Sequence, residues 1–126
     1  MKTILVVEDD TEVRVLLVRV LRDAGYQTLA AEDGTMALRV ARNQHPDMIL
    51  LDLNLPAGNG QFVLDSVTNS VELCGTPVVV LSGDPHLNEE DLKHRGAVAA
   101  FRKPVDQQVF LQSIAGIFDS SSVVEA

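Results

Sequence analysis

Apolar residues along this chain follow two alternating patterns: short continuous runs, and longer segments in which they recur at helical spacing. A short apolar run bounded by turn residues is typical of a strand buried on both faces, and the longer spacing is typical of an amphipathic helix. The runs predict strands at residues 3–7, 27–31, 48–53, 78–81 and 99–102. The spaced segments predict helices at about 11–24, 34–41, 62–71, 88–95 and 109–118.

Five strands that alternate with five helices predict one α/β domain, with a parallel sheet and helices on both of its faces. The apolar stripes of the first, third and fifth helices are expected at Val13, Leu16, Leu17, Val20 and Leu21, at Phe62, Val63, Val67 and Val71, and at Val109, Phe110, Ile114, Ile117 and Phe118. Residues 56–60 predict a loop. The serines at 120–122 predict a frayed tail or the start of a linker, so we expect the domain at 1–119 and a polar tail or linker at 120–126.

The net charge, the cysteine count and the length of the apolar runs exclude some classes of function. The net charge is -8, which argues against direct binding to nucleic acid or to an anionic membrane, so a partner with a basic or apolar surface is favoured. Cys74 is the single cysteine, so no disulfide framework is available and a reducing cytoplasm is expected. No apolar run approaches the ~20 residues that span a bilayer, and the start of the chain does not resemble a signal peptide.

Polar groups follow the ends of the predicted strands. These groups are Glu8, Asp9, Asp52, Ser82 and Lys103. Function in open α/β sheets collects beyond the carboxyl ends of the strands, so we expect these side chains to share one crevice. Close carboxylates repel by roughly 1 to 4 kcal/mol per pair, and a hard cation such as Mg²⁺, with Mn²⁺ as an alternative, relieves that repulsion.

The same crevice suits phosphoryl chemistry. A lysine and a hydroxyl beside a cation can hold the oxygens of a phosphoryl group in transfer. A carboxylate that neither caps a helix nor pairs at the surface can act as the nucleophile, and this describes Asp52. The sequence therefore predicts an aspartyl phosphate.

The chain resembles the receiver domain of two-component response regulators from Ile4 to about Phe118. The matching pieces are Leu5-Val6-Val7-Glu8-Asp9, Ala31-Glu32-Asp33-Gly34, Pro46-Asp47, Asp52-Leu53-Asn54-Leu55-Pro56 with Gly60, Leu81-Ser82-Gly83, Gly96-Ala97 and Lys103-Pro104. Each piece alone is a weak signal, but all of them occur in order at the spacing of the family. The resemblance implies a flavodoxin-like (βα)5 fold with strand order 2-1-3-4-5.

The resemblance also implies a role for each residue of the site. Asp52 accepts a phosphoryl group from a histidine kinase or a histidine phosphotransfer protein. Asp9, Asp52 and the backbone carbonyl of Asn54 ligate Mg²⁺, and Glu8 acts through water. Ser82 and Lys103 hold phosphoryl oxygens, and the bond from Lys103 to its proline is cis.

The implied protein is a signalling module rather than an enzyme, because it catalyses only its own phosphorylation and dephosphorylation. Phosphorylation is expected to switch a surface that binds a downstream output protein or an effector domain. Asn54 and Asp84 occupy positions that resemble the family's variable sites, which tune the lifetime of the aspartyl phosphate.

Three other functions fit the sequence less well. A Mg²⁺-dependent phosphohydrolase with an Asp nucleophile usually has a second acid two residues later, where Asn54 stands here. A pseudo-receiver that only binds a partner is disfavoured because the acids and Lys103 are intact. A nucleotide-binding domain is disfavoured because no glycine-rich loop follows the first strand.

Several polar residues have simpler interpretations than a place in the site. Asp10 is expected to cap the first helix rather than to ligate metal. The three histidines, His45, His86 and His94, lie in or beside polar segments without ligand spacing and are expected to be solvated. Residues 89–91 are expected to form the acidic first turn of the fourth helix.

Position 100 departs from the family pattern. Receiver domains usually carry Tyr or Phe three residues before the conserved lysine, and Ala100 stands there in this chain. Phe101 has the opposite parity in the strand, so we expect it in the core and not at the switch position.

Overall fold

The computed structural model describes residues 1–56 and 59–125, and the side chains of residues 120–125 are outside this description. Its strands are β1 (Thr3–Val7), β2 (Gln27–Ala31), β3 (Met48–Asp52), β4 (Val78–Ser82) and β5 (Ala97–Arg102). They form one parallel five-stranded sheet in the order β2-β1-β3-β4-β5. The predicted flavodoxin-like α/β fold and its strand order are confirmed.

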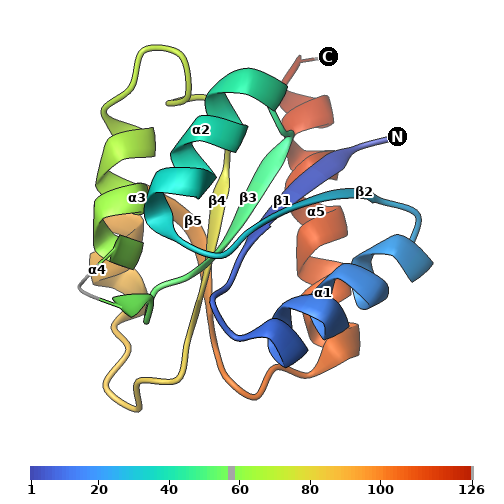
Figure 1. The fold of residues 1–126 in the computed structure, drawn as a ribbon. Helices are drawn as coiled ribbons and strands as arrows, with labels where there is room; N and C mark the ends of the chain where they lie inside the picture. The colour runs from blue at the N-terminus through green and yellow to red at the C-terminus, as the bar shows by residue number, and fades with distance from the viewer. Residues whose placement is uncertain (57–58, 126) are drawn as a thin grey trace.

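The helices alternate with the strands along the chain. They are α1 (Thr11–Asp23), α2 (Gly34–Gln44), α3 (Asn59–Thr68), α4 (Glu89–His94) and α5 (Gln107–Glu125). Figure 1 shows α2, α3 and α4 on one side of the sheet and α1 and α5 on the other. The sheet is therefore covered on both faces, which is the reason its strands are continuously apolar.

Two apolar cores lie on the two faces of the sheet. One contains Leu5, Val7, Ile49, Leu51, Val78 and Val80 from the strands, with side chains of α2, α3 and α4; we call it the α2–α4 core. The other contains Ile4, Val6, Met48, Leu50, Val79 and Leu81, with Leu21 of α1 and with Phe110 and Ile114 of α5; we call it the α1–α5 core. Alternate residues of each strand thus enter opposite cores, as the twofold period of a strand requires.

Some predicted apolar positions face solvent instead. Leu16 in α1, Phe62 in α3 and Val109 in α5 are all exposed. Val71 was predicted in the third helix, but α3 ends at Thr68 and Val71 is 97% exposed in the following turns. An apolar stripe read from sequence is wider than the strip of helix that touches a flat sheet, so its edges can remain uncovered.

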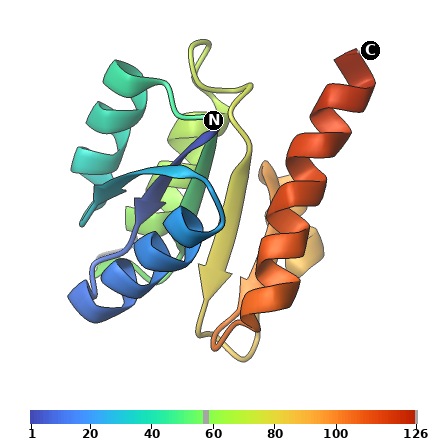
Figure 2. The same cartoon turned by 90° about the vertical axis from the view of Figure 1, so that its right-hand side faces the viewer.

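The ends of several elements differ from the prediction. β5 begins at Ala97 rather than residue 99, with a register irregularity opposite Val78 and Val79. α3 begins at Asn59, inside the predicted loop, while positions 57 and 58 of that loop lie outside the described residues. Helix α5 continues to Glu125, through the serines predicted as a tail (Figure 2). No glycine or proline follows Phe118 to stop this helix, and the domain boundary at 119 stays a prediction.

Candidate functional site

The carboxyl ends of β1, β3, β4 and β5 bring the predicted side chains to one edge of the sheet. Parallel pairing sets Val7 opposite Leu51, and Asp52 opposite Leu81. At the next strand, the Lys103 backbone N–H donates to the Ser82 carbonyl at 2.8 Å. The strand order therefore places four chain segments, far apart in sequence, around one crevice, as the topology predicts.

Three carboxylates form the centre of this crevice. One oxygen each of Glu8, Asp9 and Asp52 lies within 4.8 Å of the others. Glu8 and Asp52 are 1% and 5% exposed, whereas Asp9 is open to solvent. A buried carboxylate oxygen without a partner costs free energy, and Oε2 of Glu8 is such an atom. Three hard oxygen ligands, one of them unsatisfied, fit a cation of the Mg²⁺ type.

Lys103 supplies a positive charge to the same cluster. Its Nζ donates to Oε1 of Glu8 at 3.1 Å and lies 3.4 Å from Oδ2 of Asp52. The Lys103–Pro104 peptide bond is cis, as the family resemblance implied.

The electrostatics of the cluster are reflected in two shifted pKa values. The pKa of Glu8 is raised from 4.5 to about 8, chiefly by burial and next by the neighbouring Asp52, while Lys103 acts in the opposite direction. Burial by itself would lower the pKa of Lys103, but the hydrogen bond to Glu8 and the charge of Asp52 raise it. Lys103 therefore stays cationic, and Glu8 keeps its proton to a higher pH than a solvated glutamate does.

Asn54 connects the carboxylate cluster to Ser82. Its backbone N–H donates to Oδ1 of Asp52 at 3.0 Å. Its side-chain Oδ1 accepts from the Ser82 hydroxyl at 2.8 Å and from the Gly83 backbone N–H at 3.0 Å. From sequence, the Asn54 carbonyl was a proposed metal ligand and position 54 resembled a site that tunes the lifetime of the aspartyl phosphate. The hydrogen bonds of its side chain were missed, because no motif signals a contact between the loop after β3 and the end of β4.

Arg14 is a second residue that sequence reasoning missed. Its guanidinium donates to the backbone carbonyl of Glu8 at 2.8 Å and lies 3.4 Å from that of Asp9. These bonds fix the turn that carries both acids from β1 into α1. The only sequence signal was that Arg14 lies off the apolar stripe of the helix.

The simpler interpretations of the neighbouring polar residues are also borne out. Oδ1 of Asp10 accepts from the Val13 N–H at 3.1 Å, so Asp10 caps α1, and it is outside the carboxylate cluster. The three histidines are exposed, and none belongs to a group with metal-ligand geometry among the described residues. The acidic residues 89–91 form the first turn of α4.

Ala100 and Phe101 lie on opposite faces of β5, as the alternation of side chains along a strand predicts. Phe101 is half-buried against the α1–α5 core, with its ring edge-on to Phe110 at 5.8 Å between centroids. Ala100 packs on the opposite face, against the α2–α4 core. The face that usually carries the switch aromatic thus presents only a methyl group here.

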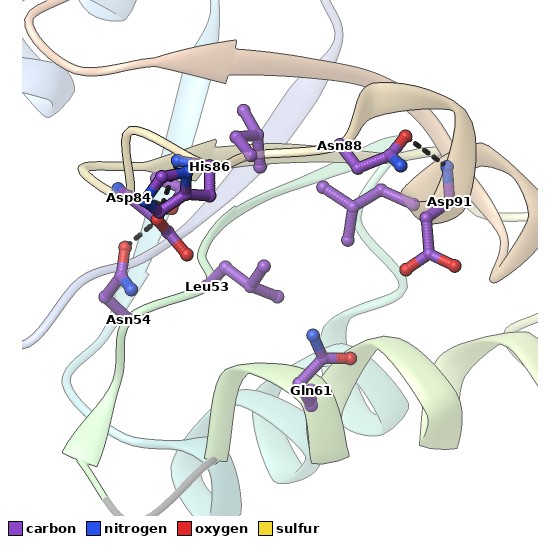
Figure 3. Close-up of a pocket in the computed structure, with 10 residues that line it drawn as sticks. Leu53, Asn54, Gln61, Asp84, His86, Asn88 and Asp91 are labelled. Atoms are coloured by element: carbon purple, nitrogen blue, oxygen red, sulfur yellow. Dashed lines mark hydrogen bonds between the residues drawn. The ribbon is translucent and has the colours of Figure 1, made fainter.

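A polar pocket of about 350 Å³ opens beside the site, between the end of β3, α3 and the segment that leads into α4. Figure 3 shows Asn54 and Asp84 at one end of it, Asn88 and Asp91 at the other, and Gln61 below them. The Asn54 side chain therefore lies between the carboxylate cluster and this pocket.

Comparisons with known proteins agree with this architecture. The family model of the response regulator receiver domain matches residues 4–115. The chain is 30% identical to the protein PilH of Pseudomonas aeruginosa, over 93% of this chain and 98% of that one, and 33% identical to the polar-differentiation response regulator DivK of Brucella ovis, over 90% and 93%. The solved structure of the chemotaxis response regulator CheY4 of Vibrio cholerae is similar with a TM-score of 0.83 at 27% identity, covering 93% of this chain and 98% of that one.

This chain is a doubly wound domain with an acidic cluster at the carboxyl edge of its sheet, and the family model matches most of its length. The chain therefore belongs to the response regulator receiver domains. Receiver domains are phosphoacceptor modules of two-component signalling rather than conventional enzymes. The cluster of Glu8, Asp9 and Asp52 is consistent with the magnesium-binding phosphorylation site of such a module. Among the described residues, no helix combines the length and apolarity needed to cross a membrane.

Proposed function

We propose that Asp52 is the residue of this receiver domain that accepts the phosphoryl group. A carboxylate oxygen of Asp52 attacks the phosphorus of a phosphohistidine, the phosphorus–nitrogen bond breaks, and the imidazole leaves as it takes up a proton. The observation that carries this proposal is the position of Asp52. It is buried at the end of the central strand β3, beside two other acids and one lysine.

Asp9 and Asp52, with the backbone carbonyl of Asn54, are the proposed ligands of Mg²⁺, and Glu8 acts through a water molecule. Mn²⁺ has the same preference for oxygen and is an alternative. A bound divalent cation would supply positive charge to the nucleophile and to the phosphoryl oxygens. The fit rests on the geometry of the three carboxylates and on the unsatisfied buried oxygen of Glu8.

Lys103 and Ser82 are proposed to hold the phosphoryl oxygens. The Nζ of Lys103 already lies between Glu8 and Asp52, so a phosphoryl group on Asp52 would fall within its reach. Ser82 ends the adjacent strand and is completely buried, with its hydroxyl beside Asn54. Lys103 is already in place, so it needs little reorganisation as charge develops on the phosphoryl oxygens, and this favours transfer.

The proposed phosphodonor is a sensor histidine kinase or a histidine phosphotransfer protein in the cytoplasm. The proposed output is a protein or an effector domain whose binding surface changes when Asp52 is phosphorylated. The net charge of -8 supports a protein partner rather than nucleic acid. The relatives named above include a regulator of polar differentiation and one of chemotaxis.

Incubation with acetyl phosphate and Mg²⁺, followed by intact-mass measurement, tests the proposal. We expect one phosphoryl group per chain, and no adduct when EDTA replaces Mg²⁺. The phosphohydrolase alternative predicts a different result, namely steady release of inorganic phosphate from many phosphomonoesters without an accumulated adduct. Asn54, which stands where such an enzyme has its general acid, accepts two hydrogen bonds and has no carboxyl proton to give.

A further inference from the structure

The orientation of the Asn54 amide is fixed by its neighbours. A backbone N–H can only donate, so the Asn54 atom 3.0 Å from the Gly83 nitrogen must be the oxygen. The Ser82 hydroxyl lies 2.8 Å from that same oxygen, and therefore must donate to it. The single hydroxyl proton of Ser82 is thus committed to Asn54.

The other side of the Ser82 hydroxyl is also occupied. Its oxygen accepts from the Asp84 backbone N–H at 3.0 Å, and Oδ1 of Asp84 accepts from the His86 N–H at 2.8 Å. Figure 3 shows Asn54 and Asp84 facing each other at this end of the pocket. The chain of bonds joins the loop after β3 to the segment after β4 and leaves Ser82 no proton to offer elsewhere.

A phosphoryl group on Asp52 needs hydrogen-bond donors, because its oxygens are acceptors. The Ser82 hydroxyl serves as a donor only after its bond to Asn54 breaks. Asn54 and the phosphoryl group therefore compete for one proton. The competition is local, because the Asn54 backbone N–H is itself bonded to Asp52, the residue that receives the phosphoryl group.

We propose that the Asn54 side chain is a positioning residue that holds Ser82, and with it the start of the β4–α4 segment, in the resting arrangement. We call the hydrogen bond from the Ser82 hydroxyl to the Asn54 amide oxygen the latch, and this bond must break when Asp52 is phosphorylated. This inference rests on the proposed phosphorylation of Asp52 and adds the group against which the phosphoryl oxygens compete. The latch links the site to residues 83–88 without any aromatic side chain, which suits a chain with alanine at position 100.

The test uses ¹⁹F NMR to measure the affinity of the protein for beryllofluoride, a stable phosphoryl mimic, in the presence of Mg²⁺. Asn54 is exposed and outside both cores, so the Asn54→Ala variant should fold normally. Removing the competing acceptor should tighten beryllofluoride binding roughly threefold to tenfold, the change expected for one neutral hydrogen bond. Both proteins are compared at saturating Mg²⁺, because the backbone carbonyl of Asn54 is a proposed metal ligand.

A double-mutant cycle with Ser82→Ala separates the latch from a general effect of the substitution. Without the Ser82 hydroxyl there is no proton to release, so Asn54→Ala should change the affinity little in that background. Gln61→Ala is the matched control, because Gln61 lines the same pocket with an amide oxygen that has no hydrogen-bond partner. It should leave beryllofluoride binding unchanged.

Equal or weaker binding by Asn54→Ala in the wild-type background overturns the latch, as does the same gain in both backgrounds. Loss of beryllofluoride uptake by the wild-type protein itself is a separate outcome. It would contradict the phosphoacceptor proposal, and the latch would fall with it.

Discussion

The ammonium group of Lys103 lies 3.1 Å from Oε1 of Glu8, although 95 residues separate the two in the chain. Glu8 is buried at the end of β1, and Lys103 follows β5 at the far side of the sheet order. The lysine also lies 3.4 Å from Asp52. Lys103 offsets only one of the negative charges that Glu8, Asp9 and Asp52 carry when all three are ionised, and this favours binding of a second cation.

Mg²⁺ should therefore stabilise the protein. At one hundred times its dissociation constant, a ligand that binds only the folded state adds roughly 2.7 kcal/mol to the free energy of unfolding. Asp9→Asn should weaken this dependence, because it removes one of the proposed ligands. The measurement is thermal unfolding against Mg²⁺ concentration at constant ionic strength.

Asp10→Asn is the matched control for that experiment. It removes an adjacent acidic charge outside the carboxylate cluster, and asparagine caps a helix as well as aspartate does. This variant should keep the full response to Mg²⁺. An equal loss in both variants would indicate general charge screening instead of a site built around Asp9.

The metal-free protein should lose stability as the pH rises from about 5 to about 8. The pKa of Glu8 is raised by burial and by Asp52 from 4.5 to about 8, so in this window the folded state holds a proton that the unfolded state has released. Because the folded state binds more protons, its free energy of unfolding falls with pH, by up to about 1.4 kcal/mol per pH unit for one proton.

Glu8→Gln tests this pH dependence, since glutamine has no proton to lose. Urea unfolding in EDTA across the same range should give a flatter pH profile for the variant than for the wild type. The exposed histidines are shared by both proteins, so the difference between the profiles isolates Glu8. Parallel profiles would show that Glu8 is ionised in the folded protein throughout.

Gly60 should be intolerant of a side chain. A Cβ at this position would stand 2.6 Å from the carbonyl carbon of Leu53 and 2.7 Å from its Cα, and rigid backbone cannot yield as a side chain does. Gly60→Ala should lower the free energy of unfolding by about 1 to 3 kcal/mol and weaken Mg²⁺ binding, because Leu53 precedes Asn54, a proposed metal ligand.

Gly116→Ala is the matched control for Gly60, since both glycines lie in helices. A Cβ at Gly116 meets no atom within 4 Å. This substitution should raise the free energy of unfolding by about 0.5 to 1 kcal/mol through helix propensity. Urea unfolding measures both effects, and equal destabilisation by the two substitutions would contradict the close approach at Leu53.

The fold and the carboxylate cluster were predictable from sequence because each depends on a strong local signal. Continuous apolar runs marked the strands, and polar groups after them, such as Asp52 and Lys103, were predicted to meet because parallel strands end at one edge. The parity of β5 placed Phe101 and Ala100 on opposite faces, which the structure confirms.

The remaining features depend on tertiary packing. The side chain of Asn54, in the loop after β3, accepts a hydrogen bond from Ser82 at the end of β4, and the spacing of these residues in the sequence does not predict that contact. Leu16 belongs to the apolar stripe of α1 but lies beyond the contact between helix and sheet. The end of α5 depends on how far a helix persists without a stop signal, which serines do not supply.

Activation should alter the segment before and within α4 more than the end of β5. Ser82 is proposed to turn toward the phosphoryl oxygens, and Gly83 is bonded to the same Asn54 oxygen. Hydrogen exchange with and without beryllofluoride should therefore change most within residues 82–95 and little at Phe101, whose ring is packed on Phe110. Deprotection centred on Phe101 would identify that ring as the moving element instead.

The identity of the phosphorylated residue is the central claim of this account. Borohydride reduces an aspartyl phosphate to homoserine, so reduction after treatment with acetyl phosphate and Mg²⁺ marks the modified position for peptide mapping. The account predicts homoserine at position 52 alone, its loss in Asp52→Asn, and its retention in Asp10→Asn. Homoserine at Asp9 or at any other aspartate, with position 52 unmodified, would contradict it.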